Sequence, residues 1–196
     1  MKIKQLTFLL AAAALIGIGG CCTPEIIGNV PNALRPQETN NWCWAATTQM
    51  LAQHFGINVN QCDLANHRFG ETVCCNPQTP GVPCPKTNTC NRPGWLELDF
   101  AGITFSESAT ALTFDVLKRQ LFCAQKPMGY AYGTPGVVGH VLVVKGYVTV
   151  GGTNYLVLND PWNPCVGEER LITYGQYQDP AGASTHWNTW YDLAKK

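Results

Sequence analysis

The chain has 196 residues, enough for one hydrophobic core but hardly for two. Its 13 Lys and Arg residues balance 13 Asp and Glu residues, so the formal net charge is zero. No block of like charge occurs, which argues against a nucleic-acid-binding protein and against a polybasic membrane patch. Charged residues make up 13% of the chain, against a usual share of about 25%. This composition, with abundant Gly and Pro, is typical of a loop-rich exported protein.

Residues 1–20 have the pattern of a signal peptide. Lys2 and Lys4 form a short positive region, and an apolar run without charge follows over residues 6–18. This run is shorter than the ~20 residues that a transmembrane helix needs. Since no comparable run occurs later in the chain, we expect no integral membrane helix.

The stretch Ile18-Gly19-Gly20-Cys21 resembles the bacterial lipobox, in which cleavage leaves a cysteine that carries the lipid. We therefore expect export and a lipid anchor at Cys21. The alternatives are ordinary cleavage near Gly20, which gives a secreted or periplasmic protein, and a disulfide bond at Cys21 or Cys22. Residues 21–36 contain three prolines and little periodicity, so they predict an extended tether. The domain would then span residues 37–196.

Ten cysteines in an exported chain favour disulfide bonds over free thiols. Four of them fall in a Pro- and Asn-rich stretch that predicts no regular structure, namely Cys74, Cys75, Cys84 and Cys90. We expect disulfides to cross-link this loop. Further partners would come from Cys62, Cys123 and Cys165. A zinc site that uses His67 with these thiols is the alternative, but the sequence has no Cys-x-x-Cys pair and we expect no metal.

Two helices are predicted in the first two thirds of the chain. Residues 41–55 carry an apolar stripe, with Asn40 or Asn41 as the cap and Gly56 at the end. Residues 113–122 follow helical spacing after a capping Thr113, and Lys126-Pro127 stops them.

The pattern then changes to strands rich in Val and Tyr. They are predicted at residues 128–132, 140–148, 154–159 and 170–174, with a weaker one at 185–191. Gly151-Gly152 marks a hairpin turn. A helix followed by an antiparallel sheet gives an α+β domain.

Cys43 lies in the first turn of the first predicted helix. The free N–H groups and partial positive charge of a helix N-terminus favour a thiolate there, as a nucleophile requires. The alternative is a disulfide-bonded or small buried cysteine. Gln37 lies six residues upstream, and Trp42 and Trp44 flank the thiol.

This segment, Gln-Glu-Thr-Asn-Asn-Trp-Cys-Trp-Ala-Ala, resembles the papain-like cysteine peptidases. The resemblance implies that Cys43 is the nucleophile and that the Gln37 amide donates to the oxyanion hole. The Cys-Gly-Ser-Cys-Trp signature of the lysosomal branch is absent. The Cys-Trp-Ala-Ala start, the later Cys-Cys and the Gly-His pair are most similar to the bacterial branch of secreted effector proteases, and more distantly to bacteriocin-leader-processing peptidases.

Four histidines compete for the role of base. His54 ends the first predicted helix, His67 lies among the cysteines and His186 adjoins Trp187, which favours structural roles for all three. His140 follows Gly139 and opens an apolar strand, where the papain-like family carries its general base.

A base needs an acceptor that orients its second ring nitrogen. The hairpin about Gly151-Gly152 is expected to bring Asp160 to the same end of the sheet as His140. The family uses Asn or Asp at this place, followed two residues later by a shielding tryptophan, which matches Trp162 here. Asn159 and Asp179 are weaker candidates, and the segment would also serve as a plain turn.

The sequence therefore predicts a papain-like domain that acts as a cysteine endopeptidase on proteins outside the cytoplasm. The residues Cys43, His140, Asp160 and Gln37 would carry the reaction through an acyl-enzyme, with no cofactor. Two other functions remain open. One is an acyltransferase or amidase on the same fold, which includes transglutaminase-like, deamidating and peptidoglycan-directed enzymes. The other is a surface protein that only binds.

Overall fold

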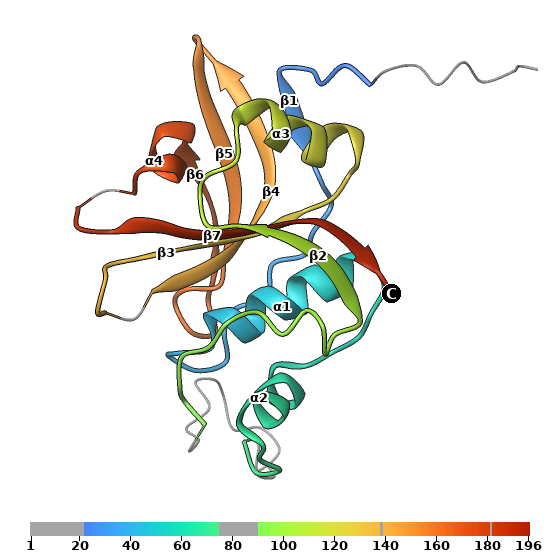
Figure 1. Cartoon of the computed structure of the whole chain (residues 1–196), viewed down its shortest axis with the longest axis vertical. Helices are drawn as coiled ribbons and strands as arrows, with labels where there is room; N and C mark the ends of the chain where they lie inside the picture. Colours follow the sequence, from blue (N-terminus) through green and yellow to red (C-terminus); the bar gives the residue numbers. More distant parts are fainter. Residues whose placement is uncertain (1–21, 75–89, 138, 181) are drawn as a thin grey trace, which may run out of the picture.

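The computed structural model describes residues 22–74, 90–137, 139–180 and 182–196. The expected α+β class is confirmed (Figure 1). The helices are α1 (Cys43–His54), α2 (Gln61–Phe69), α3 (Phe114–Lys118), the π-helical turn η1 (Arg119–Cys123) and α4 (Tyr174–Gln178). The strands are β1 (Ile27–Asn29), β2 (Ile103–Ser108), β3 (Met128–Gly133), β4 (His140–Val150), β5 (Thr153–Asp160), β6 (Glu168–Thr173) and β7 (Thr185–Lys195).

The described strands form one antiparallel sheet. Its order is β2-β7-β3-β4-β5-β6, and β1 lies off this path and pairs with β4. The first half of β4 pairs with β3, and its second half pairs with β1. The two-residue turn between β4 and β5 consists of Gly151 and Gly152, both with positive φ (57° and 80°). Such a turn matches the twist of the strands and returns β5 along β4. The end of β5 thus lies at the same end of the sheet as the start of β4.

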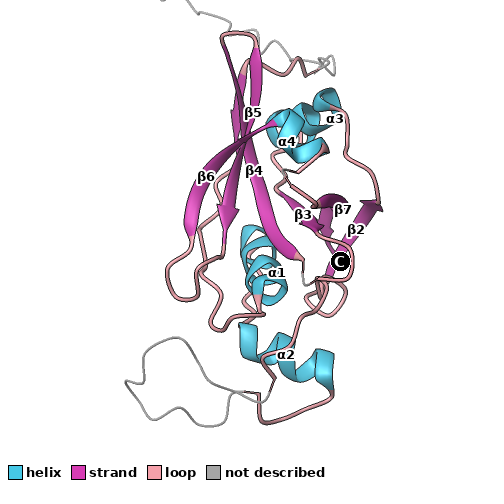
Figure 2. Ribbon diagram, turned by 90° about the vertical axis from the view of Figure 1, so that its left-hand side faces the viewer, coloured by secondary structure: helices cyan, strands magenta, loops and turns pink. Residues whose placement is uncertain are grey.

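Apolar side chains pack on both faces of β4. Val141 and Val143 join a core cluster that includes α1, whereas Leu142 and Val144 join a second cluster with residues of α3, η1 and α4. In Figure 2, α1 and α2 lie in the lower half of the molecule and α3 and α4 in the upper half. A strand that is buried on both faces reads as a continuous apolar run, which explains the sequence of β4.

The N-terminal segment is extended, but the prediction of a tether is wrong for most of it. β1 pairs with β4, and Val30 donates its N–H to Lys145 O at 2.7 Å. Asn32 Nδ2 donates to Met50 O at 2.9 Å, which fixes the segment on α1. Since these groups find partners in the sheet and the helix, the segment from about residue 27 belongs to the domain.

The helices differ from expectation in their boundaries. α1 begins at Cys43, slightly later than predicted, and the second predicted helix is split into α3 and η1. Thr113 caps α3 through a bond from Val116 N, as expected. The sequence analysis missed the remaining elements, which are β1, β2, α2 and α4. None of the helices in the described residues is long and apolar enough to cross a membrane.

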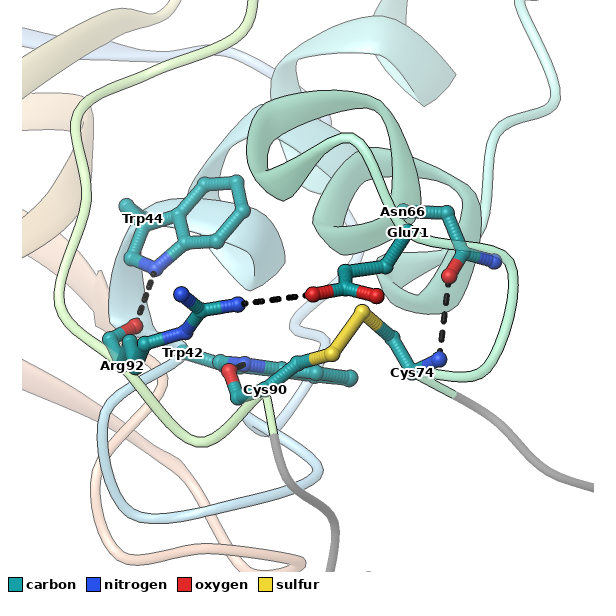
Figure 3. Close-up of a disulfide and its surroundings, with 7 residues drawn as sticks. All are labelled: Trp42, Trp44, Asn66, Glu71, Cys74, Cys90 and Arg92. Carbon is teal, nitrogen blue, oxygen red and sulfur yellow. Dashed lines mark hydrogen bonds and ion pairs between the residues drawn. A yellow bond between two sulfur atoms is a disulfide. The ribbon is translucent and has the colours of Figure 1, made fainter.

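Six of the cysteines in the described residues are disulfide-bonded. Cys74 pairs with Cys90, as expected for the loop, and both lie in the buried cluster against α1 (Figure 3). Cys22 pairs with Cys123, 101 residues away. A disulfide bond at Cys22 was one of the alternatives considered from the sequence. Cys62 and Cys165 are also disulfide-bonded. Cys21, Cys75 and Cys84 lie outside the described residues. These bridges indicate an extracytoplasmic location.

The Cys22–Cys123 bridge generates a prediction about stability. Replacing both cysteines by alanine should lower the free energy of unfolding by about 4 to 5 kcal/mol, because the bridge closes a very long loop in the unfolded chain. Cys22 is exposed, so little packing is lost. Urea denaturation followed by tryptophan fluorescence measures the effect. Fully reduced wild type and fully reduced variant serve as the control pair and should unfold alike; equal stability of the oxidised proteins would contradict the prediction.

Candidate active site

Cys43 occupies the first position of α1 with only 8% of its surface exposed, and its thiol is free. The N-cap residue Trp42 makes no side-chain cap bond. The expected cap from Asn40 or Asn41 is therefore wrong; Asn41 Nδ2 instead donates to Asn91 O at 3.0 Å. The N–H groups of the first turn receive no side-chain cap, so the partial positive charge of the helix start lies beside the first residue, Cys43.

The two tryptophans beside Cys43 fix the helix start to the segment at 90–92. Trp42 Nε1 donates to Cys90 O at 2.9 Å, and Trp44 Nε1 donates to Arg92 O at 3.3 Å (Figure 3). Both indole rings are fully buried. The Cys74–Cys90 disulfide ties the same segment to the end of α2, so the Trp-Cys-Trp motif holds the thiol against a cross-linked loop.

His140 is the first residue of β4, opposite Tyr132 of β3. The residue before His140 is Gly139. A side chain would not fit there, because the ring of Trp187 occupies the space that a Cβ would need. His140 interacts with the Cys43 thiol on one side. On the other side its Nε2 lies 2.5 Å from Asp160 Oδ1, within hydrogen-bond distance. The structure thus brings together three of the four predicted site residues, in the order thiol, imidazole, carboxylate.

The charges of this group are set by mutual contact. Burial alone opposes the charged imidazole, but the hydrogen bonds and negative charge of Asp160 and Cys43 outweigh it and raise the pKa of His140 to about 9. Burial would likewise raise the pKa of Asp160, yet its bond to His140 and the other donors around it hold that pKa below its ordinary value. Both directions favour an imidazolium beside a carboxylate at neutral pH.

Asp160 has two further donors that the sequence analysis did not identify. The backbone N–H of Trp162 donates to Oδ1 at 3.0 Å, and Arg170 Nε donates to Oδ2 at 2.7 Å. The Trp162 ring, expected to shield the pair, is 47% exposed at the rim of the site. Arg170 gave no signal in the sequence because it belongs to no motif and reaches Asp160 only through the pairing of β5 with β6.

The three residues line an open cleft of about 540 Å³. Its other walls come from the loop before α1, from β3 and the residue before β4, and from the β5–β6 connection and the start of β6. They are formed by Asn40, Asn41, Tyr132, Gly139, Trp162, Glu168 and Arg170. A cleft of this volume, lined by a thiol and an imidazole, can admit a ligand next to both groups.

Gln37 lies beside this cleft but not in its lining. The residue is fully buried, and its Nε2 donates to Thr39 O and Asn40 O, both at 2.8 Å. Its backbone N–H donates to Pro161 O at 3.1 Å, directly after Asp160. The position fits the prediction, whereas the amide hydrogens point at loop carbonyls in this structure. Its role in the oxyanion hole stays a prediction.

The other three histidines have structural contacts. His54 Nδ1 lies 3.3 Å from Pro31 O, and His67 pairs with Glu97 and stacks on a phenylalanine ring. His186 lies between Tyr177 O and a threonine hydroxyl, and burial lowers its pKa. Within the described parts of the chain, no three His, Cys, Asp or Glu side chains gather in an arrangement that could hold a metal ion.

Asn159, a weaker candidate for the orienting role, faces away from the imidazole. It is fully buried, and its Nδ2 donates to Asn32 O at 2.8 Å. Since Asn159 and Asp160 are neighbours in a strand, their side chains point to opposite faces of the sheet. Only one of the two can therefore reach His140, and the bond at 2.5 Å is made by Asp160.

Comparison with solved structures supports the fold independently. A mite allergen, from a study of limited antibody cross reactivity between Blo t 1 and Der p 1, matches with a TM-score of 0.52 at 13% identity. The match covers 89% of this chain and 73% of the allergen. Digestive procathepsin L 3 of the Tenebrio molitor larval midgut matches with a TM-score of 0.49 at 12% identity, over 87% of this chain and 72% of that one.

A search among curated proteins found no significant match. The family model described as "Peptidase_C39 like family" matches residues 29–195, which include Gln37, Cys43, His140 and Asp160. This match spans most of the chain. The protein therefore belongs to the Peptidase_C39-like family.

Proposed function

We propose that this protein is a cysteine endopeptidase that cleaves protein or peptide substrates outside the cytoplasm through Cys43, His140 and Asp160. The observation that carries the proposal is the free thiol of Cys43 at a helix start, in one cleft with an imidazole that is hydrogen-bonded to a carboxylate. A nucleophile, a base and an orienting acceptor in this order are the parts that acyl transfer requires. The open cleft supports a substrate that enters as an extended chain.

In the proposed mechanism, the Cys43 thiolate attacks the carbonyl carbon of the scissile amide. The imidazolium of His140 gives its proton to the leaving amine as the C–N bond breaks, which leaves a thioester on Cys43. His140 then takes a proton from water, and the resulting hydroxide cleaves the thioester. Asp160 keeps the ring oriented and stabilises its positive charge throughout.

The oxyanion would form next to the start of α1. The free backbone N–H groups of the first turn are the donors already directed there, as no side chain caps this helix. In our proposal Gln37 supplies the second donor when substrate binds, by exchanging its bond to Asn40 O for one to the oxyanion. The loop carbonyl would then turn to solvent, which Asn40, an exposed residue, allows.

The most direct prediction is peptide cleavage by the purified protein. Incubation with a mixed peptide library should create new α-amino termini, detected by mass spectrometry, and Cys43→Ala should abolish them because no hydroxyl or thiol replaces the nucleophile. Release of ammonia or acyl transfer without new termini would instead identify an amidase or acyltransferase. Products that persist in Cys43→Ala would contradict the proposed nucleophile.

A second prediction concerns pH. His140 is charged below its raised pKa of about 9, so peptide hydrolysis should decline as pH rises through that value and the leaving amine loses its proton donor. At pH 6, iodoacetamide should alkylate Cys43 at least about tenfold faster in wild type than in His140→Ala, because the imidazolium stabilises the thiolate. His54→Ala is the matched control and should react like wild type. Equal alkylation rates in all three proteins would argue against the ion pair.

A third prediction concerns location. We propose that residues 1–20 are an export signal and that Cys21 carries a lipid. The protein would then act while anchored at the cell envelope. Cys21→Ser should move the protein from the membrane fraction to the soluble fraction, since a multiply acylated cysteine gives stable anchoring. The control is Cys22→Ser with Cys123→Ser, which should stay membrane-bound. Mass spectrometry that finds an unmodified mature N-terminus in wild type would refute the anchor.

A further inference from the structure

We propose that Arg170 is a positioning residue of this active site, whose guanidinium is the counter-ion that lets a carboxylate, in place of a neutral amide, orient His140. The inference rests on the proposed function, because it assigns the imidazole the role of base. Neither the motifs of the sequence nor the family match singles out Arg170. Its side chain contacts residues of β5 and β3.

The pairing of β5 with β6 places Arg170 next to Asp160. Arg170 of β6 lies opposite Leu158 of β5, and Leu158 and Asp160 are two residues apart on the same face of the strand. Arg170 is therefore the diagonal cross-strand neighbour of Asp160, within reach of a long side chain. Its Nε donates to Asp160 Oδ2 at 2.7 Å, with 6% of the Asp160 side chain and 29% of the Arg170 side chain exposed. A charge-assisted bond shielded in this way is strong.

A second contact extends the support to the other neighbour of the imidazole. The terminal nitrogen Nη2 of Arg170 donates to the Tyr132 hydroxyl at 3.2 Å. Tyr132 pairs with His140 across β3 and β4, and their rings meet at right angles with centroids 5.9 Å apart. One guanidinium thus braces the carboxylate and the phenol ring that flank His140 from β5 and β3.

The charges in the cleft explain why a cation is needed there. The working state holds a thiolate at Cys43 and a carboxylate at Asp160, against one positive charge at His140. Arg170 supplies the second positive charge and makes this buried group neutral. Without it, an excess negative charge would oppose formation of the thiolate. The remaining groups that face the site cannot replace Arg170.

Those remaining groups are Glu168 and Tyr132. Glu168 of β6 is negative, lies 4.0 Å from Arg170 Nε, and is 63% exposed, so water screens it. The Tyr132 phenol stays neutral, because burial raises its pKa despite the nearby Arg170. Apart from His140 itself, no other cation is among the residues that line the cleft in the described chain.

The hydrogen bonds that Asp160 accepts predict how an asparagine would behave at this position. Oδ1 accepts from His140 and from Trp162 N, and Oδ2 accepts from Arg170. An asparagine at this position has only one oxygen. If that oxygen serves His140, the amide nitrogen faces Arg170 Nε, and two donors oppose each other. An asparagine should therefore be poorly tolerated here as long as Arg170 is present.

The first test measures the alkylation rate of Cys43 against pH, which needs no substrate, in wild type, Arg170→Met, Arg170→Gln and Arg170→Lys. Loss of the positive charge should shift the alkylation midpoint to higher pH in the Met and Gln variants, and Arg170→Lys should lie closer to wild type. The glutamine variant can still donate a hydrogen bond to Asp160 but carries no charge, so it distinguishes the effect of the charge from the effect of the hydrogen bond. It also replaces the Met variant as the test if the Met variant does not fold. Arg35→Gln removes an exposed arginine elsewhere and should leave the profile unchanged.

The second test is a double-mutant cycle on the peptide substrate. Arg170→Gln, the single variant of the cycle, should lower kcat/KM, and Arg170→Met should lower it about tenfold to a hundredfold, as expected for loss of one bond between charged groups. Asp160→Asn should be impaired, and Asp160→Asn with Arg170→Gln should recover at least part of that loss, because the side-chain oxygen of the introduced glutamine can accept from the amide of the introduced asparagine. A purely structural role of Arg170 predicts additive losses and an unmoved pH profile.

The outcomes separate the two proposals. If wild-type Cys43 shows no fast alkylation at low pH, the proposed mechanism fails. If wild type does, but the Met and Gln variants keep the wild-type midpoint, the role of Arg170 is refuted while the mechanism stands. A double variant no better than Asp160→Asn alone would likewise overturn the counter-ion account.

Discussion

The carboxylate of Asp160 is the group on which the geometry of this site depends. It accepts from the imidazole of β4, from the guanidinium of β6 and from the backbone of the turn that follows it. Three donors from three directions leave it no freedom to rotate, so His140 has one orientation available. That arrangement requires the register of β4, β5 and β6, because a slip of one residue would turn Asp160 to the opposite face of the sheet.

The thiol must meet this imidazole from a different part of the fold. Trp42 and Trp44 bind the carbonyls of Cys90 and Arg92 and so fix the start of α1. Gln37 joins this side to the sheet, since its backbone donates to Pro161 O and accepts from Cys165 N at 2.9 Å. Cys43 and His140 are therefore held in position by backbone bonds between the loop before α1 and the turn after β5, and not only by their own contact.

Much of this organisation could be predicted from sequence because it is local. Strands rich in Val and Tyr, joined by paired glycines, predict the hairpin that brings His140 and Asp160 to one end of the sheet. What depends on cross-strand contact could not be predicted: Arg170 acquires its contacts only through the pairing of β5 with β6, and the direction of the Gln37 amide depends on loop carbonyls. α2 was missed because its mostly polar sequence offers no apolar stripe. The N-terminal segment looked like a tether because its partners in β4 are more than a hundred positions away.

The chemistry of Cys43 also depends on what happens to the other thiols. An oxidising compartment threatens a free cysteine with disulfide formation. In the described part of the chain every other cysteine is already disulfide-bonded, and Cys43 is 8% exposed. The disulfides therefore do two things at once: Cys74–Cys90 fixes the loop that anchors the helix start, and the pairing of the neighbouring thiols leaves Cys43 to the imidazole. The free thiol of Cys43 can persist in such a compartment because the other cysteines of the described residues are already paired.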